Sequence, residues 1–334
     1  MARVRSVALT ASLAFGSLVL AGCGGSAGGA SAGGGGSMTI KVADAVAPDA
    51  DVNAVALAKY FGPALEKESK GKLKIRVFPA GQLGDESTLM KKLPSGTVDM
   101  VVTGVTNDPG LDALYTPWFF KDSDQIKKSL DQGVLDKQLA VLKKRNSIYV
   151  GTVYRSPREV TANKAIQSPT DLNGLKLRAP QFPGVVTVFK SLGANVAALP
   201  FPEVFTALQS GTVDAEENPV DLISSSKFYE VQKYLSLTDH SYAPYLSFVS
   251  QDMWSKLSTE QQQQFKTALK QSTDQYEQYE KDATSKIIKD LASKGMMVVK
   301  PNQAAFDAKA HPVAKTFLTS VWGPDTVAKV EALR

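Results

Sequence analysis

The chain has one cysteine, Cys23, and only two histidines, His240 and His311, in 334 residues. A single cysteine cannot close an internal disulfide, so the fold has to be stabilised by its hydrophobic core. No Cys/His cluster has the spacing of a zinc site. Carboxylates are plentiful, but no pair stands out as an acid–base couple. The sequence therefore predicts no catalytic residues, no metal site and no cofactor, and it disfavours an enzyme.

A long hydrophobic run is also missing. The apolar stretch Val7–Leu20 is broken by three hydroxyl residues and is short for a membrane-spanning helix. It follows Arg3 and Arg5 and leads into Leu20-Ala21-Gly22-Cys23, which is the pattern of a secretory signal. The last four residues look like a lipobox, at which bacterial lipoprotein processing acylates the cysteine. We therefore predict a lipoprotein signal peptide at residues 1–22. An incidental cysteine in a signal peptide is the alternative.

With Cys23 as the lipid anchor, the mature chain is extracytoplasmic. It is attached to a membrane facing the periplasm or to the outer face of a single membrane. Loss of the signal peptide leaves 36 Lys+Arg against 33 Asp+Glu, a net charge of about +3. So mild an excess is typical of solvated surface and predicts no nucleic-acid partner. Residues 23–37 are almost all Gly, Ser and Ala, and this composition predicts a flexible linker.

The roughly 300 residues from Met38 are enough for two domains. Thr39–Ala43 and Lys72–Phe78 have strand patterns, and Val52–Ser69 has helical spacing. One motif occurs twice: Leu93-Pro94-Ser95-Gly96-Thr97-Val98-Asp99 is echoed by Leu208-Gln209-Ser210-Gly211-Thr212-Val213-Asp214. A helical pattern precedes each copy, and a β-branched segment follows the glycine. The echo predicts two α/β domains of related design, with chance similarity of two helix ends as the alternative.

The C-terminal third is helical in pattern. Ser258-Thr259-Glu260-Gln261 is a capping box, the arrangement that satisfies the free amides at a helix start. It opens a stretch without proline or glycine until Gly295. The pattern predicts one helix long enough to span two domains. Two shorter helices with an unmarked break are the alternative.

Arginine is scarce. From Cys23 onward the chain has 30 lysines and six arginines, yet Arg155, Arg158 and Arg178 fall within 24 residues. Arginine presents a planar fork of donors that matches a carboxylate through two parallel bonds, which lysine cannot do. Arg178 ends an alternating segment that Pro180 closes, as at the end of a strand. This position predicts a carboxylate-binding arginine facing an interdomain cleft, with a surface salt bridge as the alternative.

Several segments resemble one known family. They are Val77–Gly84, Asp171–Pro180, Leu192–Ala194 with Glu203–Asp214 and Glu217–Pro219, and Lys227–Leu235. From about Met38 to the C-terminus, the chain resembles the DctP-type solute-binding proteins of tripartite ATP-independent periplasmic (TRAP) transporters. The resemblance implies an α/β, two-domain fold like the type II periplasmic binding proteins, with hinge strands and a long domain-bridging helix. It places 38–155 and 244–283 in domain I, and 156–243 and 284–334 in domain II.

The resemblance also implies a site. By motif position, Arg178 binds the ligand carboxylate, Arg158 assists it and Asn218 contacts the ligand. Phe201 lines the cleft, and Trp118 is a looser match on the wall of domain I. Thr103 is a polar candidate on the same wall, chosen for its side chain, because residues 101–107 match the family poorly.

The function implied is that of an extracytoplasmic solute-binding lipoprotein, expected to be a monomer. It would capture a small organic acid that contains a carboxylate and deliver it to the TRAP membrane subunits. One alternative is a sensory binding protein that hands its ligand to a receptor. A less favoured alternative is an extracytoplasmic enzyme on the same scaffold.

Overall fold

A computed structural model describes residues 36–45, 56–79, 81–242 and 244–334. The predicted signal peptide, Cys23 and nearly all of the predicted linker lie outside the described residues. Within the described ranges, no helix combines the length and the apolar character needed to cross a membrane.

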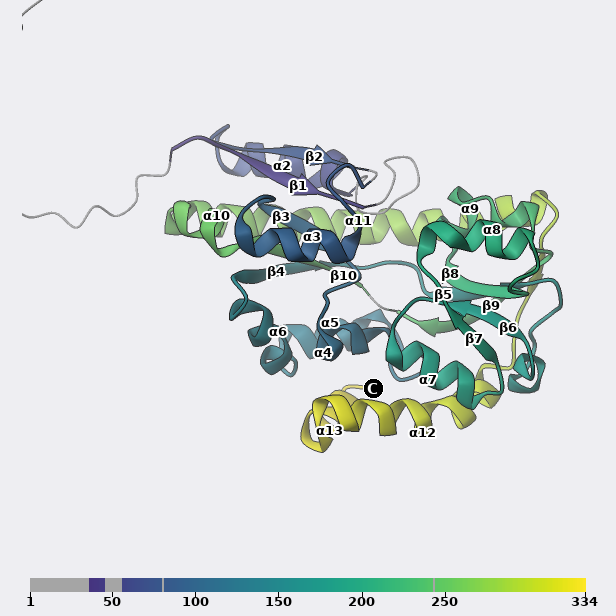
Figure 1. The fold of residues 1–334 in the computed structure, drawn as a ribbon. Helices are drawn as coiled ribbons and strands as arrows, with labels where there is room; N and C mark the ends of the chain where they lie inside the picture. Colours follow the sequence, from purple (N-terminus) through teal and green to yellow (C-terminus); the bar gives the residue numbers. More distant parts are fainter. Residues whose placement is uncertain (1–35, 46–55, 80, 243) are drawn as a thin grey trace, which may run out of the picture. The chain divides into compact units, whose positions relative to one another are not determined.

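Two mixed β-sheets organise the structure (Figure 1). The first has the order β2 (Leu73–Phe78), β1 (Met38–Ala43), β3 (Met100–Thr103), β10 (Tyr245–Ser250) and β4 (Ser147–Val153). The second has the order β11 (Met297–Val299), β9 (Tyr234–Ser241), β5 (Arg158–Ala162), β8 (Ala215–Pro219), β6 (Lys176–Ala179) and β7 (Asn195–Ala198). We call the parts built on these sheets the first lobe and the second lobe. They confirm the predicted two-domain α/β fold.

Short helices connect the strands. Those of the first lobe are η1 (Ala56–Phe61), α2 (Gly62–Glu68), α3 (Glu86–Lys92), η2 (Leu93–Ser95), α4 (Pro109–Asp112), η3 (Ala113–Tyr115), α5 (Ser123–Asp131), α6 (Asp136–Lys143) and α10 (Gln251–Lys256). Those of the second lobe are η4 (Pro169–Leu172), α7 (Pro183–Ser191), η5 (Phe201–Glu203), α8 (Val204–Gln209), α9 (Val220–Ser225) and η6 (Phe228–Glu230). The predicted strands at the N-terminus are β1 and β2. The predicted helix from Val52 corresponds to η1 and α2 in its described part.

The repeated motif has the same structural role in both lobes. Gly96 and Gly211 follow a helix with φ of 70° and 73°, a left-handed conformation that glycine adopts without strain. The motif's aspartate then accepts a hydrogen bond from the backbone of a neighbouring parallel strand. Asp99 binds the Lys41 amide at 2.8 Å, and Asp214 binds the Lys176 amide at 3.3 Å. Each copy therefore ends a helix and aligns two strands of its sheet.

Two connections between the lobes directly join strands of the two sheets: the segment from β4 to β5 and the segment from β9 to β10. Each sheet contains one strand, β10 or β5, that runs antiparallel to both of its neighbours. A third connection is α11 (Thr259–Ser293), an unbroken helix of 35 residues and therefore about 52 Å long. Ser258 and Gln261 form the predicted capping box at its start. This helix packs on η1, α2 and β4 of the first lobe and on α9 and β11 of the second, which rules out two shorter helices.

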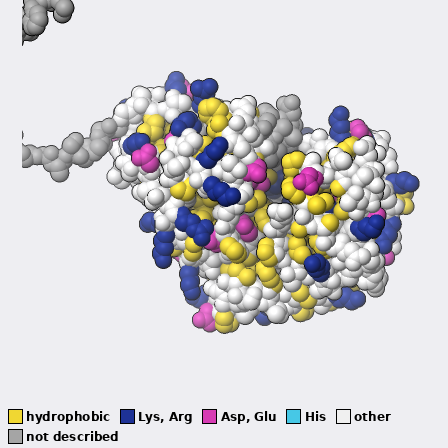
Figure 2. Space-filling view, in the orientation of Figure 1, with side chains coloured by type: hydrophobic (Ala, Val, Ile, Leu, Met, Phe, Trp, Pro, Cys, Tyr) yellow, Lys and Arg dark blue, Asp and Glu magenta, His cyan; other side chains and the backbone are white. Residues whose placement is uncertain are grey.

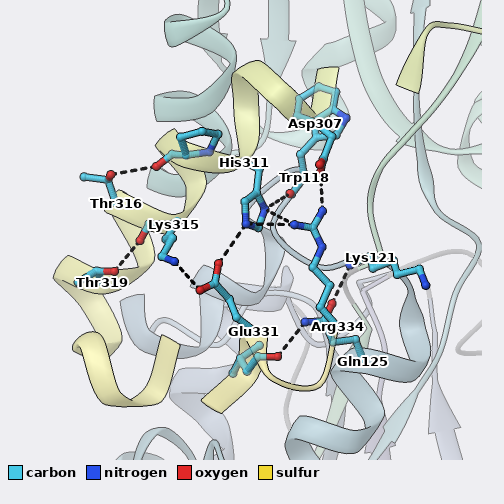
Figure 3. A network of polar contacts seen from close by, with 12 residues as sticks. Trp118, Lys121, Gln125, Asp307, His311, Lys315, Thr316, Thr319, Glu331 and Arg334 are labelled. Atoms are coloured by element: carbon cyan, nitrogen blue, oxygen red, sulfur yellow. Dashed lines mark hydrogen bonds and ion pairs between the residues drawn. The ribbon is translucent and has the colours of Figure 1, made fainter. Parts of the chain in front are cut away.

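The last two helices, α12 (Gln303–Trp322) and α13 (Pro324–Glu331), touch both lobes. Helix α12 packs along α7 of the second lobe. On the first-lobe side, the indole N–H of Trp322 donates to the Gly110 carbonyl at 2.6 Å. His311 bonds to the Trp118 carbonyl at 2.9 Å and to Glu331 at 3.1 Å (Figure 3). One continuous apolar cluster here includes residues from both sheets, so apolar packing joins the lobes on this side.

Candidate functional site

A pocket of about 610 Å³ is lined by residues of both lobes. Four of the six residues predicted to contact ligand lie on its wall: Arg158, Arg178, Phe201 and Asn218. Figure 2 shows the surface of one face, on which Lys and Arg side chains are dispersed among Asp and Glu. Among the described residues, no group of three His, Cys, Asp or Glu is placed to hold a metal ion.

Arg178 is the third residue of β6. Successive side chains of a strand point to opposite faces, so Leu177 enters the core and Arg178 lines the pocket. Its Nε and Nη2 atoms both donate to the Leu199 carbonyl, at 3.0 and 2.7 Å. A guanidinium has five N–H donors, so these bonds leave Nη1 and one Nη2 hydrogen, the other edge of the fork, without a partner in the described chain.

Arg178 forms no ion pair with any described residue. The side chain is 2% exposed, and no carboxylate of the described residues lies within 4.0 Å of it. Burial lowers the pKa of Arg178 to about 10, although the more distant Glu217 and Glu216 oppose that shift. Because that pKa is well above neutrality, the group stays protonated. The site therefore contains a desolvated cation with two donors available to an anion.

Arg158, at the start of β5, is neutralised within the protein. Its Nε and Nη2 atoms bind the two carboxylate oxygens of Glu217 at 2.5 and 2.8 Å. Glu217 also bonds to Nε2 of His240 at 2.9 Å. Burial alone would raise the pKa of Glu217, but Arg158 and the His240 bond hold it down at about 2. Arg158 thus reaches the pocket as a hydrogen-bond donor whose charge is already paired.

Asn218 is fixed by two neighbours. Its Oδ1 accepts from Arg158 at 3.0 Å, and its Nδ2 donates to Glu216 at 2.6 Å. Burial raises the pKa of Glu216 to about 7. The amide therefore has a defined orientation, with its nitrogen on the side of Glu216 and one N–H left for other partners.

Phe201, the first residue of η5, forms an apolar part of the wall together with Leu199 and Phe182. Its ring packs edge-on against Phe228, with centroids 6.3 Å apart. Phe182 in turn lies 4.5 Å from the ring of Tyr115 in the first lobe. The pocket thus combines polar groups at β5, β6 and β8 with an aromatic rim.

The first lobe contributes three carboxylates that the sequence did not single out, Asp85, Glu86 and Asp112, and the last two are held by threonines of the same lobe. Glu86, at the start of α3, accepts from the Gly104 amide at 2.8 Å and from the Thr103 hydroxyl at 3.0 Å. Asp112, at the end of α4, accepts from the Thr106 amide at 2.8 Å and from its hydroxyl at 2.9 Å. Burial, opposed by these bonds but helped by Asp108 and Glu86, raises the pKa of Asp112 to about 6. Thr103 does not line the pocket; it holds Glu86, which does.

Trp118 was predicted on the cleft wall, but the structure places its side chain in the core. Its indole stacks parallel to Phe306 of α12 at 5.1 Å and lies 5.4 Å from Phe189 of α7. Its backbone amide donates to the His240 carbonyl at 2.6 Å. Phe306 of α12 lies nearly 190 residues further along the chain, so nothing near Trp118 in the sequence indicates that its side chain is buried.

Comparisons with known proteins show the family of the chain. The DctP family model, "Bacterial extracellular solute-binding protein, family 7", matches residues 44–320. The chain is 33% identical over 285 residues to the 2,3-diketo-L-gulonate-binding periplasmic protein YiaO of Escherichia coli, covering 83% of this chain and 87% of that protein. It is 31% identical over 284 residues to the sialic acid-binding periplasmic protein SiaP of Vibrio cholerae, with the same coverage.

The solved structures include a TRAP periplasmic solute-binding protein from Roseobacter denitrificans with bound L-galactonate. It superposes with a TM-score of 0.77 at 30% identity, covering 89% of this chain and 99% of that one.

Proposed function

The chain belongs to the DctP family of bacterial extracellular solute-binding proteins, which serve TRAP transporters, and from that premise we propose that it captures a small organic acid in the cleft between its lobes. The family consists of binding proteins and not of enzymes. In this proposal the loaded protein delivers the acid to the membrane subunits of a TRAP transporter.

The observation that carries the proposal is the state of Arg178. A buried guanidinium without an ion-pair partner in the described chain is costly unless an anion completes it. Its unused edge provides the two parallel donors that suit a carboxylate. The ligands named for the three relatives above, 2,3-diketo-L-gulonate, sialic acid and L-galactonate, are all sugar acids, which favours this class.

The other residues have supporting roles in this proposal. Arg158 donates through the part of its guanidinium that Glu217 leaves open, and Asn218 donates through its second N–H. Phe201 excludes water from one side of the ligand. Thr103 acts indirectly, by orienting Glu86.

We assign residues 38–155 and 244–283 to one domain and 156–243 and 284–334 to the other. The basis is the strand order, in which β10 belongs to the first sheet although β5 to β9, which precede it in sequence, form the second. The two domains close when ligand bridges them. Ligand shifts this equilibrium because it contacts both walls only in the closed form.

A thermal-shift screen tests the proposal. Sugar acids, keto acids, dicarboxylates and aromatic acids are added to the purified protein. A true ligand at about 100 times its Kd adds about 2.7 kcal/mol to the free energy of unfolding. For a chain of this size, we expect the melting temperature to rise by roughly 4 °C. Mass spectrometry then checks that the ligand is recovered unchanged. No response to any acid, or conversion of the ligand, would contradict the proposal.

We also propose that Cys23 is acylated and ties the protein to the membrane through residues 23–37. The basis is the Leu20-Ala21-Gly22-Cys23 motif, in which the only cysteine of the chain occupies the modified position. We expect the wild-type protein to appear in the membrane fraction with a diacylglyceryl group on its N-terminal peptide. Cys23→Ser should remove that mass and release the protein from the membrane. Wild-type protein found free of lipid would refute the anchor.

A further inference from the structure

Charge is segregated across the cleft. The cationic side chains that line it, Arg155, Arg158 and Arg178, come from the second lobe and from the segment leading into it. The first-lobe wall carries Asp85, Glu86 and Asp112; apart from Arg155, which follows β4 in the connection to the second lobe, no Lys or Arg is found among its described lining residues. The two walls therefore favour opposite ends of a ligand.

Only one of the three arginines retains charge for a ligand. Arg158 is bound by both oxygens of Glu217. Arg155 lies 3.4 Å from Asp221 and stacks 4.2 Å over the Tyr245 ring. Among the described residues, Arg178 donates its hydrogen bonds to the neutral Leu199 carbonyl and forms no ion pair. The cleft can thus neutralise one anionic group and has no second unmatched cation in the described wall.

The opposite wall repels a second anion. Glu86 uses Oε1 to bind Thr103 and Gly104, and Asp112 uses Oδ1 to bind Thr106. Their remaining oxygens, Oε2 and Oδ2, accept no hydrogen bond from the described residues. They can accept from hydroxyl groups of a ligand, but a carboxylate at that place meets like charge in a partly desolvated site.

We propose that this cleft selects acids with a single negative charge and hydroxyl donors at the end away from the carboxylate, and that Glu86 and Asp112 reject a second carboxylate. The inference rests on the proposed function and names the substrate class of that same site. Volume cannot produce this selectivity. A sugar monoacid and the diacid of equal chain length differ by only a few atoms, and about 610 Å³ is ample for either.

Matched pairs of acids test the charge rule on the wild-type protein. The pairs are erythronate with tartrate, gluconate with glucarate, and galactonate with galactarate, titrated by calorimetry at pH 7.5. For every pair that binds, we expect the monoacid to bind at least about 30-fold more tightly, because placing like charges together is unfavourable. Equal or tighter binding of the diacid overturns the inference and leaves the proposed function intact. Failure of all six acids to bind contradicts the proposed function for hydroxy acids as well.

Two substitutions then test the assigned residues. Glu86→Gln and Asp112→Asn keep the size and one oxygen acceptor but remove the charge. Each should reduce the preference for the monoacid by about 5–10-fold, mainly through tighter diacid binding. Asp274→Asn removes an exposed carboxylate of α11 and should leave the preference unchanged. An unchanged preference in both cleft variants, or loss of both ligands from a folded variant, overturns the assignment of Glu86 and Asp112.

Discussion

Replacing Arg178 by alanine is expected to weaken binding of the acid ligand by at least about 30-fold. Removing one partner of a buried, hydrogen-bonded charge pair typically costs 2–5 kcal/mol. Arg178 is 2% exposed and remains protonated at neutral pH, since its pKa is about 10. Water therefore cannot easily replace the lost contact. Calorimetric titration of the best ligand from the thermal-shift screen measures the change.

Two further variants distinguish the contribution of the two parallel N–H donors of Arg178 from that of its positive charge. Arg178→Lys keeps a cation but presents no pair of parallel donors, and it cannot also hold the Leu199 carbonyl as the guanidinium does. We expect it to lose about 10-fold in affinity. Lys176→Ala, two residues earlier on the same strand and exposed, should bind as the wild type does. Wild-type affinity in Arg178→Lys would disprove the two-bond contact.

Glu217→Gln is expected to lower the free energy of unfolding by about 3–5 kcal/mol, the usual result of leaving one buried charge without its partner. Arg158 would keep its charge in a site where its side chain is 7% exposed, and His240 would lose its carboxylate acceptor. Urea unfolding followed by circular dichroism measures the loss. The double variant Arg158→Met, Glu217→Leu removes both charges and should recover much of it.

The pH dependence gives an independent check on Glu217. Its pKa is lowered from the ordinary 4.5 to about 2, so its contribution to stability is complete above pH 4.5 and is lost as the pH falls toward 2. The difference in stability between the wild type and Glu217→Gln should therefore shrink over that interval. A difference that stays constant with pH would argue against the ion pair as its source.

Features with a local cause could be predicted from the sequence. The capping box at Ser258 and the absence of proline or glycine before Gly295 are sufficient to predict α11. Alternation along Leu175–Arg178 predicts β6, and the repeated Ser-Gly-Thr-Val-Asp motif predicts a helix end and a strand in each lobe. In these cases the residues that decide the structure are neighbours in the chain.

Features that depend on distant partners could not be predicted in this way. Arg158 and Glu217 are 59 residues apart, and only the pairing of β5 with β8 shows that the charge of this arginine is already matched. Glu86 and Asp112 look like ordinary acidic residues until Thr103 and Thr106 are seen to hold them at the cleft. Trp118 is an aromatic residue of the kind that often lines a cleft, but its side chain is buried because α12 packs over it.

Strand β10 belongs to the first sheet but follows the strands of the second lobe in sequence. This topology also determines the order in which a chain made from its N-terminus can fold. Five strands of the second sheet, β5 to β9, come from residues 158–241 without interruption. In the first sheet, β3 and β4 are joined only through β10, which begins at Tyr245. The first sheet therefore stays incomplete, with β4 unpaired among the described strands, until residues 245–250 have been made. We expect the rate-limiting step of folding to be the insertion of this late strand, because it closes the longest loop in either sheet.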